Sequence, residues 1–78
     1  MDWKHHITSD KSILSGKPVI VNTRISVEFI LERLSDGWTE EMILKNYPSL
    51  TPQSIKAVFA YALDCLKDGL LYDKSLIA

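Results

Sequence analysis

The sequence predicts a mainly α-helical fold, in which a three-helix core of the helix-turn-helix type follows a short N-terminal β element. Apolar residues recur at helical spacing in three consecutive segments, and each segment has its own capping residues. The connections between these segments are short. A chain of 78 residues has room for one hydrophobic core, so we treat 1–78 as a single domain with an arm (1–25), a helical core (26–69) and a tail (70–78).

The arm is expected to be extended. Residues 18–21 (Pro-Val-Ile-Val) form a β-branched run that follows a turn signal at 15–17. We expect the stretch 4–8 to pair with this run as a second short strand. Neither strand is long enough to form a stable sheet alone, and pairing across a homodimer interface would solve that problem.

The first helix is expected to begin at Ser26 and to end at Gly37. The Ser26 hydroxyl can accept a hydrogen bond from a free backbone N–H, and Glu28 lies in the first turn, where the helix dipole favours an acid. Gly37 lies where a left-handed residue would cap the other end. The apolar residues at helical spacing are Val27, Ile30, Leu31 and Leu34.

Two further helices are expected after the first. The second begins at Thr39 and stops at about Tyr47, because Pro48 follows. The third begins at Thr51, has Pro52 at its first helical position and runs for about sixteen residues to Gly69. We expect the second helix to present Met42, Ile43 and Tyr47, and the third to present Ile55, Val58, Phe59, Ala62, Leu63 and Leu66.

The composition is typical of a folded cytoplasmic protein, with 46% hydrophobic and 24% charged residues. No apolar run approaches the ~20 residues of a membrane span, and the N-terminus lacks the apolar stretch of a signal peptide, so we expect no membrane partner. The lone Cys65 cannot form an internal disulfide and suits a reducing compartment. We expect it to be an inert apolar residue.

We expect neither catalysis nor a cofactor. His5 and His6 are adjacent, so in a strand they would point to opposite faces and could not share a metal ion. A Cys–His nucleophile pair would need an oxyanion hole and a cleft, for which a three-helix core has little volume. Because so short a chain buries a small core, we expect a homodimer.

The charges indicate a basic arm and an acidic middle segment. Residues 1–26 carry four Lys or Arg against two Asp, whereas residues 27–50 carry two against five Asp or Glu. The net charge of the whole chain is −1. A strong DNA-binding domain usually shows a clearer basic patch than this one.

Two stretches of the chain resemble a known family. Residues 16–27 (Gly-Lys-Pro-Val-Ile-Val-Asn-Thr-Arg-Ile-Ser-Val) resemble the GKPxIxGTRIxV signature of the DUF433 family. Residues 47–52 (Tyr-Pro-Ser-Leu-Thr-Pro), with Ala-Tyr-Ala at 60–62, resemble its YPxLTP…AYA block, and the resemblance covers roughly residues 5–65. Asn22 stands where the family usually has Gly. Asn is the next most tolerant residue of a left-handed backbone, so we expect the turn to be kept.

The resemblance implies a homeodomain-like helical fold and a role as a VapB-type antitoxin that partners a PIN-like ribonuclease toxin. Our leading hypothesis is therefore an antitoxin of a type II toxin–antitoxin system, a homodimer that binds this toxin and, as a further possibility, its own operator DNA. A basic, RNA-cleaving partner would suit the acidic middle segment. The alternatives are a DNA-binding transcriptional regulator without a toxin, or an oligomerisation module.

If the third helix is a recognition helix, the outward residues near its N-terminus would meet the major groove of DNA. Glutamine can pair with adenine, and lysine can contact guanine or a phosphate. One cation on this face is few for a specific binder, so a solvated face is the alternative. The candidate DNA contacts are Thr51, Gln53, Ser54 and Lys56, with Ala57, Ala60 and Tyr61 further along and Lys17 and Arg24 from the arm.

Arg24 lies between the expected strand and the first helix, which gives it two interpretations. Its guanidinium could contact a phosphate or the toxin. Alternatively, it could tie the strand to the helix through backbone carbonyls and an acid such as Glu28.

The candidate partner contacts lie at the two ends of the chain. Trp3 is either an interface anchor or an ordinary packing residue. Trp38, between Gly37 and Thr39, is expected to pack over the first helix as part of the core. The tail either orders on the toxin or folds back onto its own core, and its candidate contacts are Leu70, Leu71, Tyr72, Leu76 and Ile77.

Overall fold

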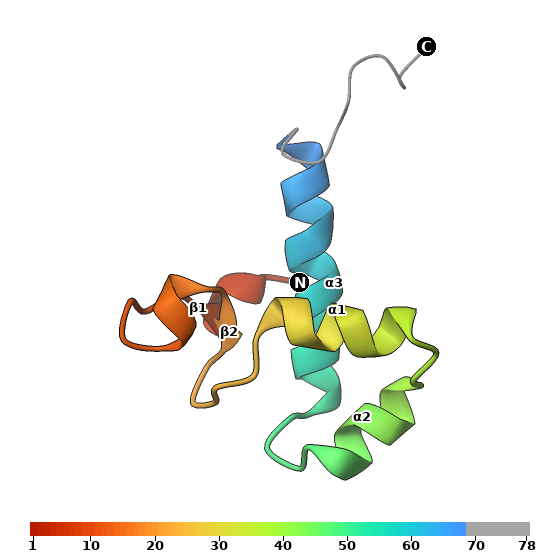
Figure 1. The fold of residues 1–78 in the computed structure, drawn as a ribbon. Helices are drawn as coiled ribbons and strands as arrows, with labels where there is room; N and C mark the ends of the chain where they lie inside the picture. Colours follow the sequence, from red (N-terminus) through yellow and green to blue (C-terminus); the bar gives the residue numbers. More distant parts are fainter. Residues whose placement is uncertain (69–78) are drawn as a thin grey trace.

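The computed structural model describes residues 1–68, and in this part the chain is mainly helical with one small sheet (Figure 1). This confirms the predicted class of a helical core with a short N-terminal β element. The predicted tail and Gly69 lie outside the described residues. In chain order, the elements are the 3₁₀ turn η1 (Trp3–His5), β1 (Ile7–Thr8), η2 (Leu14–Gly16), β2 (Val19–Ile20), α1 (Val27–Ser35), α2 (Glu40–Asn46) and α3 (Pro52–Lys67).

The two predicted strands pair with each other inside the chain, but each is shorter than expected. The expectation of a strand over 4–8 is wrong for its first residues, because the chain turns there in η1 and only Ile7–Thr8 is extended. β1 and β2 are antiparallel, with Ile7 opposite Ile20 and Thr8 opposite Val19. The Val21 N–H extends the ladder by donating to the His6 carbonyl at 2.9 Å. Strands this short gain their stability from packing, and both β2 residues are buried against the helices.

The predicted caps of α1 are formed at both ends. The Ser26 hydroxyl accepts from the Phe29 N–H at 2.9 Å. At the other end Gly37 has a φ of +96°, and its N–H donates to the Leu34 carbonyl at 3.1 Å. The Trp38 N–H donates to the Arg33 carbonyl at 3.0 Å, which completes a Schellman motif.

The caps of α2 and α3 also follow the prediction. The Thr39 hydroxyl accepts from the Met42 N–H at 3.1 Å. Thr51 caps α3, and Pro52 takes the first helical position. In the other direction, the Ser54 hydroxyl accepts a hydrogen bond from the Thr51 N–H at 3.1 Å. This reciprocal pair is a capping box, which supplies a partner to two backbone donors that would otherwise have none.

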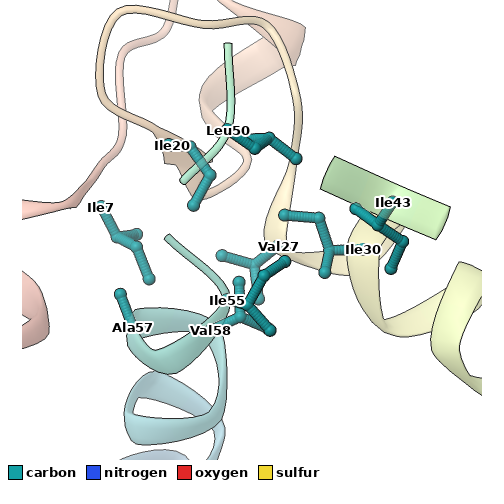
Figure 2. Packing of buried hydrophobic residues seen from close by; sticks show 9 residues of the cluster. All are labelled: Ile7, Ile20, Val27, Ile30, Ile43, Leu50, Ile55, Ala57 and Val58. Carbon is teal, nitrogen blue, oxygen red and sulfur yellow. The ribbon is translucent and has the colours of Figure 1, made fainter. Parts of the chain in front are cut away.

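The core is a single cluster to which the sheet, all three helices and the α2–α3 loop contribute (Figure 2). Figure 2 shows Val27 of α1 beside Ile55 and Val58 of α3, whereas Ile30 lies beside Ile43 of α2. The cluster therefore joins α1 to both other helices through aliphatic side chains. Its members are Ile7, Ile20, Val27, Ile30, Ile43, Leu50, Ile55, Ala57 and Val58.

The predicted apolar face of α3 is wrong over part of its length. Ala57, expected to face outward, is fully buried, whereas Phe59 and Leu63, expected in the core, are 53% and 50% exposed. The reason is geometric: α3 is about 24 Å long at 1.5 Å per residue. Its buried residues all lie between positions 54 and 58, and the helix continues beyond the level of α1 (Figure 1). On α2, Met42 is likewise exposed instead of packed.

Candidate functional site

A largely apolar hollow lies between α1 and the second half of α3. We call it the α1–α3 groove; it encloses about 530 Å³. On the α1 side the spacing of i, i+3, i+4 and i+7 brings positions 28, 31, 32 and 35 to one side of the helix. The apolar lining residues are Pro18, Val27, Leu31, Tyr61, Ala62 and Cys65, and the polar ones are Glu28, Glu32 and Ser35.

A row of acids follows the groove along α1. Glu28, Glu32 and Asp36 are one helical turn apart, and the side chains of the first two are 62% and 54% exposed. Lys17 Nζ lies 3.5 Å from Glu28 Oε2, and Arg33 Nη2 lies 3.9 Å from Glu32 Oε2 and 3.4 Å from Asp36 Oδ2. The Lys17–Glu28 pair is exposed on both sides, so it contributes little to stability.

The α3 wall of the groove contains Tyr61 and the single cysteine. Burial, together with the neighbouring Cys65, raises the pKa of Tyr61 above its usual value. Cys65 is half-buried and forms part of the lining. Within residues 1–68, no three His, Cys, Asp or Glu side chains gather closely enough to hold a metal ion. The groove therefore offers apolar contact surface together with carboxylates.

Trp3 packs on the second half of α3. Its indole Nε1 donates to Asp64 Oδ2 at 2.6 Å, and its ring meets that of Tyr61 edge to face, with centroids 4.8 Å apart. The structure therefore places Trp3 in ordinary intramolecular packing, the second of its two interpretations. This contact ties the N-terminal arm to α3.

Only part of the predicted DNA-contacting face exists as a free surface. Ser54 is 5% exposed, and its hydroxyl is used in the capping box with Thr51. The expectation that Ser54 points outward is therefore wrong, because the third residue of a capped helix turns its side chain back to the cap. Gln53 and Lys56 do lie exposed on α3.

The arm residues proposed for DNA contact lie in different surroundings. Lys17 pairs with Glu28, so the acid expected to hold Arg24 is held by another cation. Arg24 is exposed and, among residues 1–68, makes no ion pair and no side-chain hydrogen bond.

Arg24 borders an open hollow of about 880 Å³, together with Lys11 and Asp10. Backbone and hydroxyl hydrogen bonds from Ser12 lower the pKa of Asp10. No α3 residue lines this hollow, so the structure does not bring Arg24 together with Gln53 or Lys56 there.

Sequence reasoning missed a cluster around Arg33 that joins α1 to α2. The guanidinium carbon lies 5.0 Å from the centre of the Phe29 ring and 5.8 Å from that of Trp38. Tyr47 meets Phe29 edge to face at 5.3 Å and stacks on Trp38 at 6.4 Å. Trp38 therefore packs near α1, as expected, but with a cation as its neighbour. The i, i+4 spacing of Phe29 and Arg33 was the available signal.

The exposed pair Phe59 and Leu63 was also missed as a surface. They lie one turn apart on the second half of α3, so they share a face of this helix. They are among the large apolar side chains that residues 1–68 leave exposed. No helix within residues 1–68 has the length and apolarity that a membrane crossing requires.

Comparisons with known proteins are consistent with the resemblance read from the motifs. The sequence profile described as "Protein of unknown function (DUF433)" matches residues 7–62. The uncharacterized protein y4eO of Sinorhizobium fredii (strain NBRC 101917 / NGR234) is 34% identical over 56 residues, which cover 72% of this chain and 25% of that protein. The chain thus spans about a quarter of the length of this relative.

A solved structure shares the fold. The crystal structure of a DUF433 member protein from Anabaena variabilis ATCC 29413 superposes with a TM-score of 0.73 at 27% sequence identity. The match covers 80% of this chain and 61% of that one.

Proposed function

We propose that this chain, which belongs to the DUF433 family of proteins of unknown function, is the antitoxin of a type II toxin–antitoxin pair and binds a PIN-like ribonuclease toxin in the cytoplasm. The observation that carries the proposal is the α1–α3 groove, an apolar hollow bordered by Glu28 and Glu32. An apolar surface with an acidic edge is suited to a protein partner.

Electrostatics favours a basic partner. A ribonuclease needs positive charge to hold RNA, and the acidic row of α1 complements such a surface. Opposite charges on the two proteins raise the rate of their encounter, whereas the apolar contacts slow their separation. Phe59 and Leu63 add exposed apolar area to the same half of α3.

The proposal includes a homodimer with a homeodomain-like helix-turn-helix arrangement of α2 and α3. The two helices are joined by a short turn, since α2 ends at Asn46 and α3 begins at Pro52. The small buried core supports a second subunit as an additional source of stability.

The test is co-expression with the product of the neighbouring gene. We expect the two proteins to purify as a complex and the antitoxin to restore growth of cells that express the toxin. The double variant Glu28→Gln/Glu32→Gln should weaken the complex, most strongly at low salt. The matched control, Glu40→Gln/Glu41→Gln, neutralises two exposed acids on α2 and should leave the complex intact. Absence of both a complex and growth rescue would remove the proposal.

A DNA-binding regulator without a toxin is the second candidate, because Gln53 and Lys56 are exposed at the start of α3. It predicts tight binding to its own promoter that weakens steeply as salt rises. Gln53→Ala should relax the preference for an adenine, and Lys56→Ala should reduce the salt dependence. Undetectable or salt-insensitive binding would count against it, and failure of both tests would favour an oligomerisation module.

A further inference from the structure

We infer that the α1–α3 groove receives an amphipathic α-helical segment whose apolar face is flanked by Lys or Arg residues. This deepens the proposed function, on which it rests, by naming the part of the partner that the antitoxin holds.

The groove lacks what a small polar ligand would require. Its polar lining residues are two glutamates and one serine, all on α1. Sites for small molecules bring several precisely placed polar groups to converge on the ligand. An apolar hollow between two helices is instead typical of helix-in-groove recognition.

The occupant is a helix and not an extended peptide. Both long walls of the groove belong to helices, α1 and α3, whose backbone groups are already hydrogen-bonded within each helix. An extended segment would bring its own N–H and C=O groups against two helices that have no backbone groups left to pair with them. A helix satisfies these groups internally. The small side chains of Ala62 and Cys65 let its backbone approach the α3 wall.

The negative charge of the groove predicts positively charged residues beside the apolar face of the incoming helix. Among residues 1–68, no Lys or Arg lines the groove, and Glu28 and Glu32 are one helical turn apart. Two cations at i and i+4 on the incoming helix would match these two carboxylates. Each carboxylate already has one cation nearby, Lys17 at 3.5 Å from Glu28 and Arg33 at 3.9 Å from Glu32. The Lys17–Glu28 pair is exposed on both sides, and an incoming cation would have to displace it.

Lys17 therefore competes with the partner for Glu28. Replacing Lys17 by alanine should strengthen the binding of a basic helix, because it leaves Glu28 free to pair with the partner. Lys45 is exposed in the last turn of α2, outside the groove, and supplies the control Lys45→Ala.

The probes are three synthetic 14-residue peptides. The first is an amphipathic helix with a leucine face flanked by lysines, and the second has glutamates in place of the lysines. The third has the composition of the first in scrambled order.

The readout is the reactivity of Cys65. Because Cys65 is the only cysteine of the chain and lines the groove, its rate of reaction with an aromatic disulfide reports occupancy directly. We expect the lysine peptide alone to slow this reaction, by about tenfold at saturation, and Lys17→Ala to tighten its binding severalfold.

A matched pair of variants localises the binding. Ala60 and Ala62 are both half-buried on α3, but only Ala62 lines the groove. Ala62→Arg should weaken binding of the lysine peptide at least tenfold, and Ala60→Arg should leave it unchanged. If Ala62→Arg does not fold, as judged by circular dichroism, Ser35→Arg at an exposed border position takes its place and should also weaken binding.

Several results would overturn the inference. Equal binding of the lysine, glutamate and scrambled peptides would remove the charge argument, and equal effects of Ala60→Arg and Ala62→Arg would remove the site. Protection of Cys65 without peptide, rising with protein concentration, would show that a second copy fills the groove. A toxin that binds Ala62→Arg as well as the wild type would refute this inference and leave the antitoxin proposal standing. A toxin that does not bind the wild type, while the lysine peptide still binds it, would refute the antitoxin proposal and leave this inference standing.

Discussion

The two halves of α3 differ in their surroundings more than in their sequences. The first half, 52–58, holds every buried residue of this helix, whereas the second half, 59–67, exposes Phe59 and Leu63. The second half is nevertheless the more apolar of the two in sequence. Apolar residues at helical spacing therefore identify an amphipathic helix without showing which of them face its own core. The second half carries apolar side chains that the described residues, 1–68, leave uncovered.

Different interactions stabilise the two halves. The first is fixed by its capping box and by aliphatic contacts with α1 and the sheet. The second is held in the described part of the chain by the Trp3 contacts to Tyr61 and Asp64. Substitutions in the first half should therefore change the free energy of unfolding, and those in the second half should change binding.

The largest expected effect is that of Ile55→Ala, which removes a fully buried side chain. It should lower the free energy of unfolding by about 2–5 kcal/mol, since the lost transfer energy is joined by the cost of a cavity. Leu63→Ala, which truncates a half-exposed side chain on the same helix, should cost less than about 0.5 kcal/mol. Urea unfolding followed by circular dichroism measures both. Equal losses would show that the second half is supported as firmly as the first.

A smaller effect is expected at the N-cap of α3. Thr51→Ala removes the hydroxyl that accepts from the Ser54 N–H, and should cost about 1 kcal/mol in unfolding free energy. Ser49→Ala, in the exposed loop before it, is the control and should be nearly neutral. A thermal melt resolves this difference. A neutral Thr51→Ala would mean that the buried contacts alone hold the first half in place.

The support of the second half can be tested at Trp3. Trp3→Phe keeps an aromatic ring against Tyr61 but loses the indole donor to Asp64, an exposed hydrogen bond. We expect a loss of about 0.5–1 kcal/mol in unfolding free energy. In a double-mutant cycle with Asp64→Asn, the two losses should not add, because both remove one interaction. Additive losses would show that this hydrogen bond does not couple the arm to α3.

Local rules predicted the parts of the fold that depend on neighbouring residues. The caps at Ser26, Thr39 and Thr51 and the left-handed Gly37 follow from the chemistry of a few adjacent positions. Asn22 has a φ of +65°, so it keeps the left-handed turn that the resemblance suggested. Such features need no knowledge of tertiary contacts.

What the sequence could not predict depends on where elements meet. The buried position of Ala57 follows from the point at which α3 meets the rest of the core, which no local pattern encodes. The groove needs Pro18, α1 and α3 to be brought together, and the choice of Lys17 over Arg24 as the partner of Glu28 is likewise tertiary. The sequence identified Glu28 as a first-turn acid and a possible partner of Arg24, and it showed Glu32 only as part of the charge excess in the middle of the chain.

The smallest expected effect is also the most direct test of the contrast within α3. Phe59→Ser replaces a large, half-exposed apolar side chain with a small polar one, and the free energy of unfolding should change by less than about 0.5 kcal/mol. Urea unfolding measures this, and Val58→Ser, at the adjacent but fully buried position, is the matched control. Val58→Ser should be severely destabilising, because it combines a cavity with a buried hydroxyl. A large loss at Phe59 would mean that its exposed ring is covered by another part of the protein, and that the second half of α3 is core.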